Sequence, residues 1–178
     1  MFQKPKKMYR CCILILVIIL LCSCGGKEMR AKKEIDNLLA QIDRGNLHLT
    51  IYYFDPAKFT LLPVSIDSIV NGGCDYKCSI DDTSLSEQNE LFGQLKNASL
   101  ALVEQESRVD ARIYYIFEDN KDRKILDICM WGDNDSIYIN GVEYQWDVVF
   151  YNIIRPFLTD DLTEYMDKQC EAIMQSKN

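Results

Sequence analysis

The hydrophobic positions near the start of the folded part first follow a helical period and then a strand period. Residues 27–44 place apolar side chains on one helical face, which predicts a helix that Gly45 ends. The next segment, 47–54, alternates between apolar and polar residues, which predicts a half-buried strand. The apolar positions of the two elements are Ile35, Leu38, Leu39 and Ile42 in the first and Leu47, Leu49, Ile51 and Tyr53 in the second.

From Lys58 to Ser79 the pattern is weak. Residues 61–64 favour an extended conformation, and residues 65–70 favour a single helical turn. Asn71-Gly72-Gly73 is typical of a turn. No strand is predicted in this part of the chain.

Strands return after residue 108. Residues 109–117 are rich in aromatic and β-branched side chains and predict a strand, and residues 124–131 predict the next one. Asn140-Gly141 is a strong hairpin signal between the short strands 136–139 and 142–144. The intervening turns, 120–122 and 132–135, are so short that these strands must form an antiparallel meander.

Helices are predicted before and after the meander in the sequence. Ser84 with Glu87 fits a capping box that opens a helix from Leu85 to about Leu102, or only to Asn97. Residues 148–155 favour a helix stopped by Pro156, although Val148 to Tyr151 suit a strand equally well. Residues 159–175 predict a closing helix with acidic residues in its first turn. The predicted fold class is α+β, a single domain in which helices cover one face of an antiparallel sheet.

The first 24 residues have a different character. Four basic residues precede an unbroken apolar run from Cys11 to Cys22, which suits an export signal and is too short to span a bilayer as a helix. The following Leu21-Cys22-Ser23-Cys24 resembles the lipobox of bacterial lipoproteins. The later half of the chain, with its meander, Asn-Gly hairpin and closing helix, also resembles small uncharacterised domains of secreted bacterial lipoproteins.

The resemblance implies a processing route and a location. Signal peptidase II would cleave before Cys24, whose sulfur would carry a diacylglyceryl group and whose amino group would often be acylated (palmitate-type chains). The chain would divide into a signal peptide (1–23), a lipidated N-terminus with a short tether (24–30) and a globular domain (31–178). Gly25 after the lipidated position, instead of Asp, resembles the signal for the outer membrane, so we expect an anchor in the cell envelope, on the periplasmic or surface side.

The net charge argues against one class of partner, and the cysteine content leaves several disulfide pairings possible. Removal of residues 1–23, which hold four basic and no acidic residues, changes the net charge from −7 to −11. So acidic a chain is not expected to bind nucleic acid, whose phosphates need clustered cations. The mature domain retains four cysteines that allow three disulfide pairings or none: Cys74, Cys78, Cys129 and Cys170.

Candidate chemistry is sparse. One histidine, His48, cannot build a metal site alone, and no cysteine has the flanking signature of a Cys-His hydrolase. The turn Gly132 to Asp135 lacks the glycine and glutamate that a calcium loop requires. Asp110 and Arg112 share one strand face and suggest either a half-buried pair, a recognition spot or a solvated face.

These observations predict no catalytic residue, no cofactor and no metal ligand. The expected function is a non-catalytic binding or interaction module, held in the membrane lipid through acylated Cys24 and contacting an envelope protein. The alternative is a small envelope enzyme that uses carboxylates or a thiol.

Overall fold

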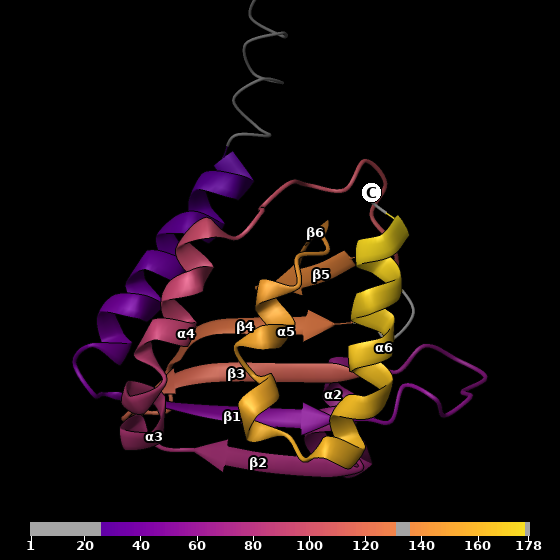
Figure 1. The fold of residues 1–178 in the computed structure, drawn as a ribbon, viewed down its shortest axis with the longest axis horizontal. Helices are drawn as coiled ribbons and strands as arrows, with labels where there is room; N and C mark the ends of the chain where they lie inside the picture. Colours follow the sequence, from indigo (N-terminus) through magenta and orange to yellow (C-terminus); the bar gives the residue numbers. More distant parts are fainter. Residues whose placement is uncertain (1–25, 131–135, 177–178) are drawn as a thin grey trace, which may run out of the picture.

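The structure, a computed structural model, describes residues 26–130 and 136–176. Cys24 with its signal segment, Trp131 and the predicted turn at 132–135 lie outside the described residues. The described part is an α+β domain whose six-stranded antiparallel sheet has helices packed against it, as the sequence predicts (Figure 1). Within this part, no helix has the length and apolar character that crossing a membrane requires.

The sheet has the strand order β2-β1-β3-β4-β5-β6. Its last four strands form the predicted meander, and β1 lies between β2 and β3. The strands are β1 (Leu47–Tyr53), β2 (Tyr76–Ile80), β3 (Ile113–Asp119), β4 (Lys124–Met130), β5 (Ser136–Ile139) and β6 (Val142–Gln145). Asn140 and Gly141 both have positive φ, of 47° and 77°, as a type I′ hairpin turn requires.

The helices are mostly short. The two long helices are the N-terminal helix, which covers residues 26–42, and α6 (Asp160–Ser176). Between them lie α2 (Ile66–Ser68), the kinked turn η1 (Ile69–Gly73), α3 (Asp82–Glu87), α4 (Asn89–Gly93), η2 (Gln94–Asn97), α5 (Val149–Asn152) and η3 (Arg155–Phe157).

The main core lies between the sheet and the larger helical layer. Alternation along each strand points one set of side chains to this face, where the apolar stripes of the N-terminal helix, α3, α4, α5 and α6 cover them (Figure 1). Phe92 of α4 packs edge-to-face on Phe117 of β3, with ring centroids 5.8 Å apart. The largest fully buried side chains include Tyr115, Tyr144, Tyr151, Phe92, Phe117 and Phe150.

The opposite face carries a smaller cluster. Ile69 of η1 covers aromatic and thiol side chains of the sheet that include Tyr52, Tyr114 and Cys129. The connection 98–112 also crosses this region, where the buried Glu143 carboxylate accepts hydrogen bonds from the Ser107 amide at 2.6 Å and the Ser136 hydroxyl at 2.8 Å. These bonds satisfy a charge that would otherwise be costly to bury.

Several local predictions were wrong. Ser84 does not cap a helix, because Asp81 is the cap: its carboxylate accepts the Ser84 amide at 2.9 Å, and α3 begins at Asp82. The α3, α4 and η2 series ends at Asn97, the earlier of the two predicted ends. Strand β2 was not predicted, since its pairing partner β1 lies more than 20 residues away and its own polar positions hide the period.

The predicted strand at 109–117 begins only at Ile113, because Asp110 and Ala111 are hydrogen-bonded to Val64, the residue after the 55–63 loop. The segment 148–155 splits into α5 and η3, with Pro156 inside η3 instead of ending a longer helix. Residues 26–30, which the domain division assigned to a tether, already belong to the N-terminal helix.

Candidate interaction loop

The loop between β1 and α2 exposes three large apolar side chains. Phe59 is 89% exposed, Leu61 is 91% exposed and Leu62 is 72% exposed. The loop, residues 55–63, extends beyond the sheet at the right of Figure 1. Burying such a side chain is worth roughly 1.5–3 kcal/mol, so a folded chain normally turns it inward. Clustered exposure of this kind is typical of an interaction site.

Arg112 holds the 55–63 loop to the domain. This side chain is almost buried, and it donates to the Lys58 carbonyl at 3.1 Å and to the Thr60 hydroxyl at 3.1 Å. It also pairs with Asp110 at 2.9 Å and lies 5.2 Å from the centre of the Phe54 ring. One planar guanidinium therefore fixes two points of the loop to the domain.

Two carboxylates fix the ends of the loop. Asp75 accepts the Asp55 amide at 2.9 Å and is paired with the Lys58 ammonium. The hydrogen bond from Lys58 and the one from the Asp55 amide lower the pKa of Asp75. At the other end, the Asp110 carboxylate accepts the Val64 amide at 2.7 Å. The Asp55 amide, the Lys58 carbonyl and the Thr60 hydroxyl are thus tied to the domain, which restricts the conformations of the loop that carries the apolar side chains.

An open hollow of about 570 Å³ separates the loop from the domain. The loop forms one wall, with Pro56 and Pro63 near its ends, and Asp110, Arg112 and Tyr165 of α6 form the other. The hollow is lined by apolar side chains of the loop and by the charged side chains of Asp110 and Arg112. This arrangement gives a partner both an apolar tip and polar groups to contact.

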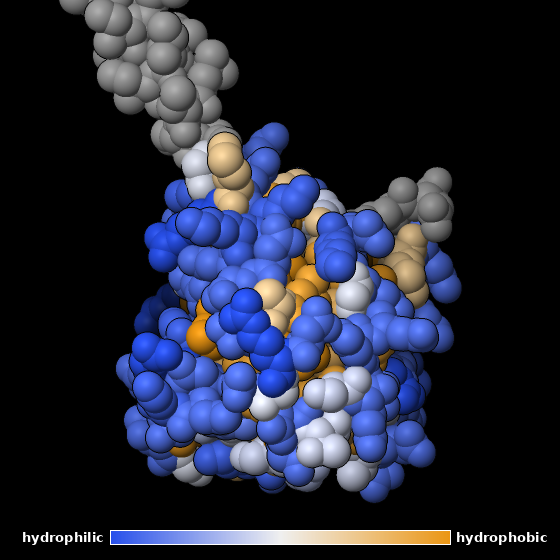
Figure 2. All heavy atoms as spheres, turned by 90° about the vertical axis from the view of Figure 1, so that its left-hand side faces the viewer, coloured by the Kyte–Doolittle hydropathy of each residue, from blue (hydrophilic) through white to orange (hydrophobic). Residues whose placement is uncertain are grey.

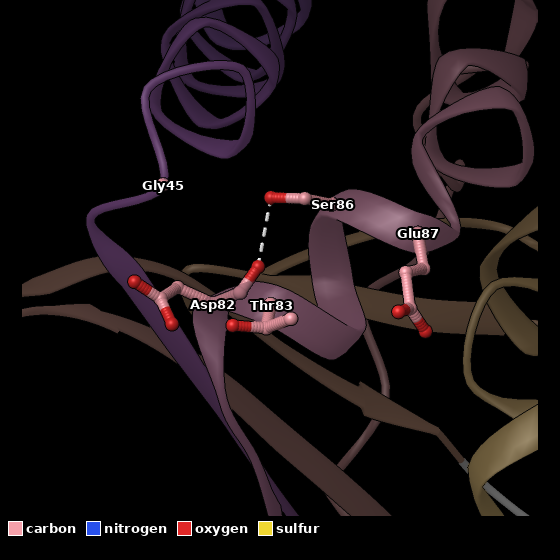
Figure 3. Close-up of a pocket in the computed structure, with 5 residues that line it drawn as sticks. All are labelled: Gly45, Asp82, Thr83, Ser86 and Glu87. Carbon is pink, nitrogen blue, oxygen red and sulfur yellow. Dashed lines mark hydrogen bonds between the residues drawn. The ribbon is translucent and has the colours of Figure 1, made fainter.

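A second hollow, of about 460 Å³, lies where the N-terminal helix turns into β1 (Figure 3). Its lining includes Asp82 and Glu87 of α3, but Figure 3 shows their carboxylates pointing away from each other. Ser86 donates its hydroxyl to the Asp82 carbonyl at 2.8 Å, which closes the helical turn. The side chains do not converge on one point, so the 55–63 loop is the better candidate. The flank of the molecule seen in Figure 2 is mainly hydrophilic, with apolar atoms visible between polar side chains.

The structure separates His48 from Cys78, Cys129 and Cys170. His48 faces Glu118 at 3.4 Å on the sheet side opposite the main core. Cys129 lies on the same side, but the strand register places it two strands and four residues away, roughly 16 Å at ordinary sheet spacing. Cys78 and Cys170 belong to the main core on the other side. A Cys-His pair is therefore not formed by these residues.

All four cysteines of the described domain are free thiols. Cys74 packs with the smaller cluster and Cys78 with the main core, so the intervening residues direct the two side chains to opposite faces of the sheet. Burial raises the pKa of the Cys78 thiol, raises that of Cys170 to about 12 and raises that of Cys129 further. Burial therefore disfavours the thiolate form that nucleophilic chemistry needs.

The pair Asp110 and Arg112 was the one candidate from the sequence that the structure places at the loop, as a half-buried ion pair. Phe59, Leu61 and Leu62 were missed, because a short apolar run in a region without periodicity reads as an extended core segment. The available signal was the proline on each side, Pro56 and Pro63, which marks a loop more than a strand.

Comparison with known proteins gives no further guidance. The sequence matches no protein-family profile, and neither the curated proteins nor the solved structures gave a significant match.

Proposed function

We propose that this chain is a lipid-anchored, non-catalytic interaction module of the bacterial cell envelope, which contacts a protein partner through the 55–63 loop. The observation that carries the proposal is the exposure of Phe59, Leu61 and Leu62 on a backbone held by Arg112. An ordered loop loses little conformational entropy on binding, so exposed apolar side chains on it are well suited to recognition.

The packing of the N-terminal helix is consistent with an anchor close to the domain. Only Gly25 separates Cys24 from Gly26, the first described residue of this helix, so the Cα atoms of Cys24 and Gly26 are about 7 Å apart at most. The first turn is fastened to β6, since the Lys27 carbonyl accepts the Tyr144 hydroxyl at 3.1 Å. An acylated Cys24 would hold the β6 end of the sheet against the membrane.

Two basic residues in the first turns of this helix are already paired with carboxylates. Lys27 pairs with Glu106 at 3.0 Å and Arg30 with Glu34 at 2.9 Å, so part of their charge is already compensated. Two or more acyl chains suffice for stable anchoring. The lipid is therefore proposed as the anchor and the loop as the functional surface.

The anchor is tested with Cys24→Ser in the native host. We expect the wild-type chain in the membrane fraction with the mass of an acylated protein starting at residue 24, and the variant without acyl mass and released from that fraction. A wild-type chain that lacks acyl mass would exclude the anchor.

The loop is tested with Phe59→Ser, Leu61→Ser and Leu62→Ser together, in the anchored protein. We expect native electrophoresis of mildly solubilised envelopes to show a complex with the wild type that this triple variant loses. Met174→Ser is the control, because Met174 is 44% exposed on α6 and lies about 13 Å further along this helix than Tyr165, which lines the hollow. Loss of the complex in the control, or its persistence in the triple variant, would contradict the role of the loop.

A further inference from the structure

We propose, on the basis of the function above, that the 55–63 loop docks into an apolar pocket of a protein whose pocket rim is basic. The apolar part of this inference follows from the three exposed side chains at the tip of the loop. Anchoring side chains of this type, seated in a partner's pocket, provide most of the affinity in protein interfaces.

The basic rim follows from the charges that surround the loop. Tyr165 lines the hollow, and Asp161 lies one helical turn before it on the same face of α6. Glu164 is also exposed on this helix, but it pairs with Lys168 at 2.7 Å and so adds no net charge. Nearby, Lys58 and Arg112 are each engaged with a carboxylate, Asp75 and Asp110 respectively. Asp55 at the start of the loop and Asp161 take part in none of the ion pairs of the described residues, so the surroundings of the loop are acidic on balance. A complementary surface is positively charged.

The anchoring bilayer does not fit these features. The N-terminal helix is about 25 Å long at 1.5 Å per residue, and β1 then adds about 23 Å across the sheet before the loop begins. Figure 1 shows the start of this helix at the top of the molecule, with the loop at the lower right and α6 between them. An anionic leaflet would also repel the acidic residues near the loop.

A second copy of the chain does not fit either. Two loops that meet would bring the same acidic residues of α6 against each other, and like charges at an interface are unfavourable. The mature chain carries a net charge of −11 once residues 1–23 are removed, which adds to the repulsion. A basic protein partner is the occupant that satisfies both the apolar tip and its acidic surroundings.

The partner is identified by a photo-crosslinking amino acid at Leu61 in the full-length protein in its native host, with the same amino acid at exposed Lys121 as the positional control. We expect a protein adduct from position 61 that position 121 does not give, identified by mass spectrometry. An adduct with a second copy, an adduct with phospholipid, or no adduct at position 61 would overturn the proposal.

Binding is then measured between the identified protein and the full-length, lipidated chain in nanodiscs. We expect Leu61→Ser to weaken binding about 10-fold or more at both low and high salt. Asp161→Asn should weaken it at low salt only and reduce its salt dependence, while Asp36→Asn, exposed on the N-terminal helix, should leave it unchanged.

The two proposals fail in different ways. Binding that depends on Leu61 but is unaffected or strengthened by neutralising Asp161 would overturn the basic rim and leave the interaction loop intact. Binding that is independent of Leu61 would overturn both.

Discussion

Replacing Arg112 tests how much this one side chain contributes to the order of the 55–63 loop and to the stability of the domain. Arg112→Ala removes the hydrogen bonds to Lys58 and Thr60 and the ion pair with Asp110. The two bonds to neutral acceptors are worth about 0.5–1.5 kcal/mol each, and the bond to a carboxylate about 1.5–3 kcal/mol. Asp110 is partly solvated, so part of the last contribution is recovered from water.

The expected loss in the free energy of unfolding is therefore about 2–3 kcal/mol. Arg112→Lys keeps a positive charge beside Asp110 but lacks the planar fork that reaches all three acceptors, so we expect roughly half of that loss. Urea denaturation followed by far-ultraviolet circular dichroism measures both values. Amide hydrogen exchange should become faster at Lys58, whose amide is bonded within the loop to the Asp55 carbonyl.

The control is Lys168→Ala. Lys168 pairs with Glu164 at 2.7 Å, but both side chains are about 70% exposed, so the change should cost less than about 0.5 kcal/mol. The reasoning is refuted if Arg112→Ala leaves the unfolding free energy within the range of this control and leaves exchange in the loop unchanged. If the loop does loosen, partner binding should weaken as well, because a disordered loop must lose conformational entropy when it binds.

Three further predictions concern the domain itself. The hydrogen bond from Arg123 lowers the pKa of Asp119 to about 2, so the stability from this carboxylate is present above its unfolded pKa near 4 and is lost as the pH falls toward 2; Asp119→Asn should flatten urea-derived stability over that range, and an unchanged pH profile would contradict the assignment. Cys129 and Cys170 should resist iodoacetamide in the folded protein and react after denaturation, since burial raises the pKa of both thiols; rapid labelling of either in the native state, detected by peptide mass spectrometry, would count against the described packing. Gly141→Ala should lower the unfolding free energy by about 1–2 kcal/mol, because φ is +77° in this turn, and a neutral result in thermal or urea melts would argue against the type I′ hairpin.

The sequence by itself determined the elements whose signals are local. The helix before β1, the alternation of β1, the Asn140-Gly141 hairpin and α6 all follow from periodicity, turn chemistry and capping within a few residues. The fold class followed as well, because short turns leave an antiparallel arrangement as the only way to join successive strands. The proposed lipid anchor at Cys24 also rests on sequence alone.

The tertiary structure decided what depends on distant partners. Strand β2 exists because β1 offers it an edge, and its polar positions gave no period to detect. Leu61 and Leu62 look like core residues in the sequence, yet Arg112, about 50 positions later, holds their loop away from the core. Whether an apolar side chain is buried depends on the room that other elements leave for it, and no local pattern contains that information.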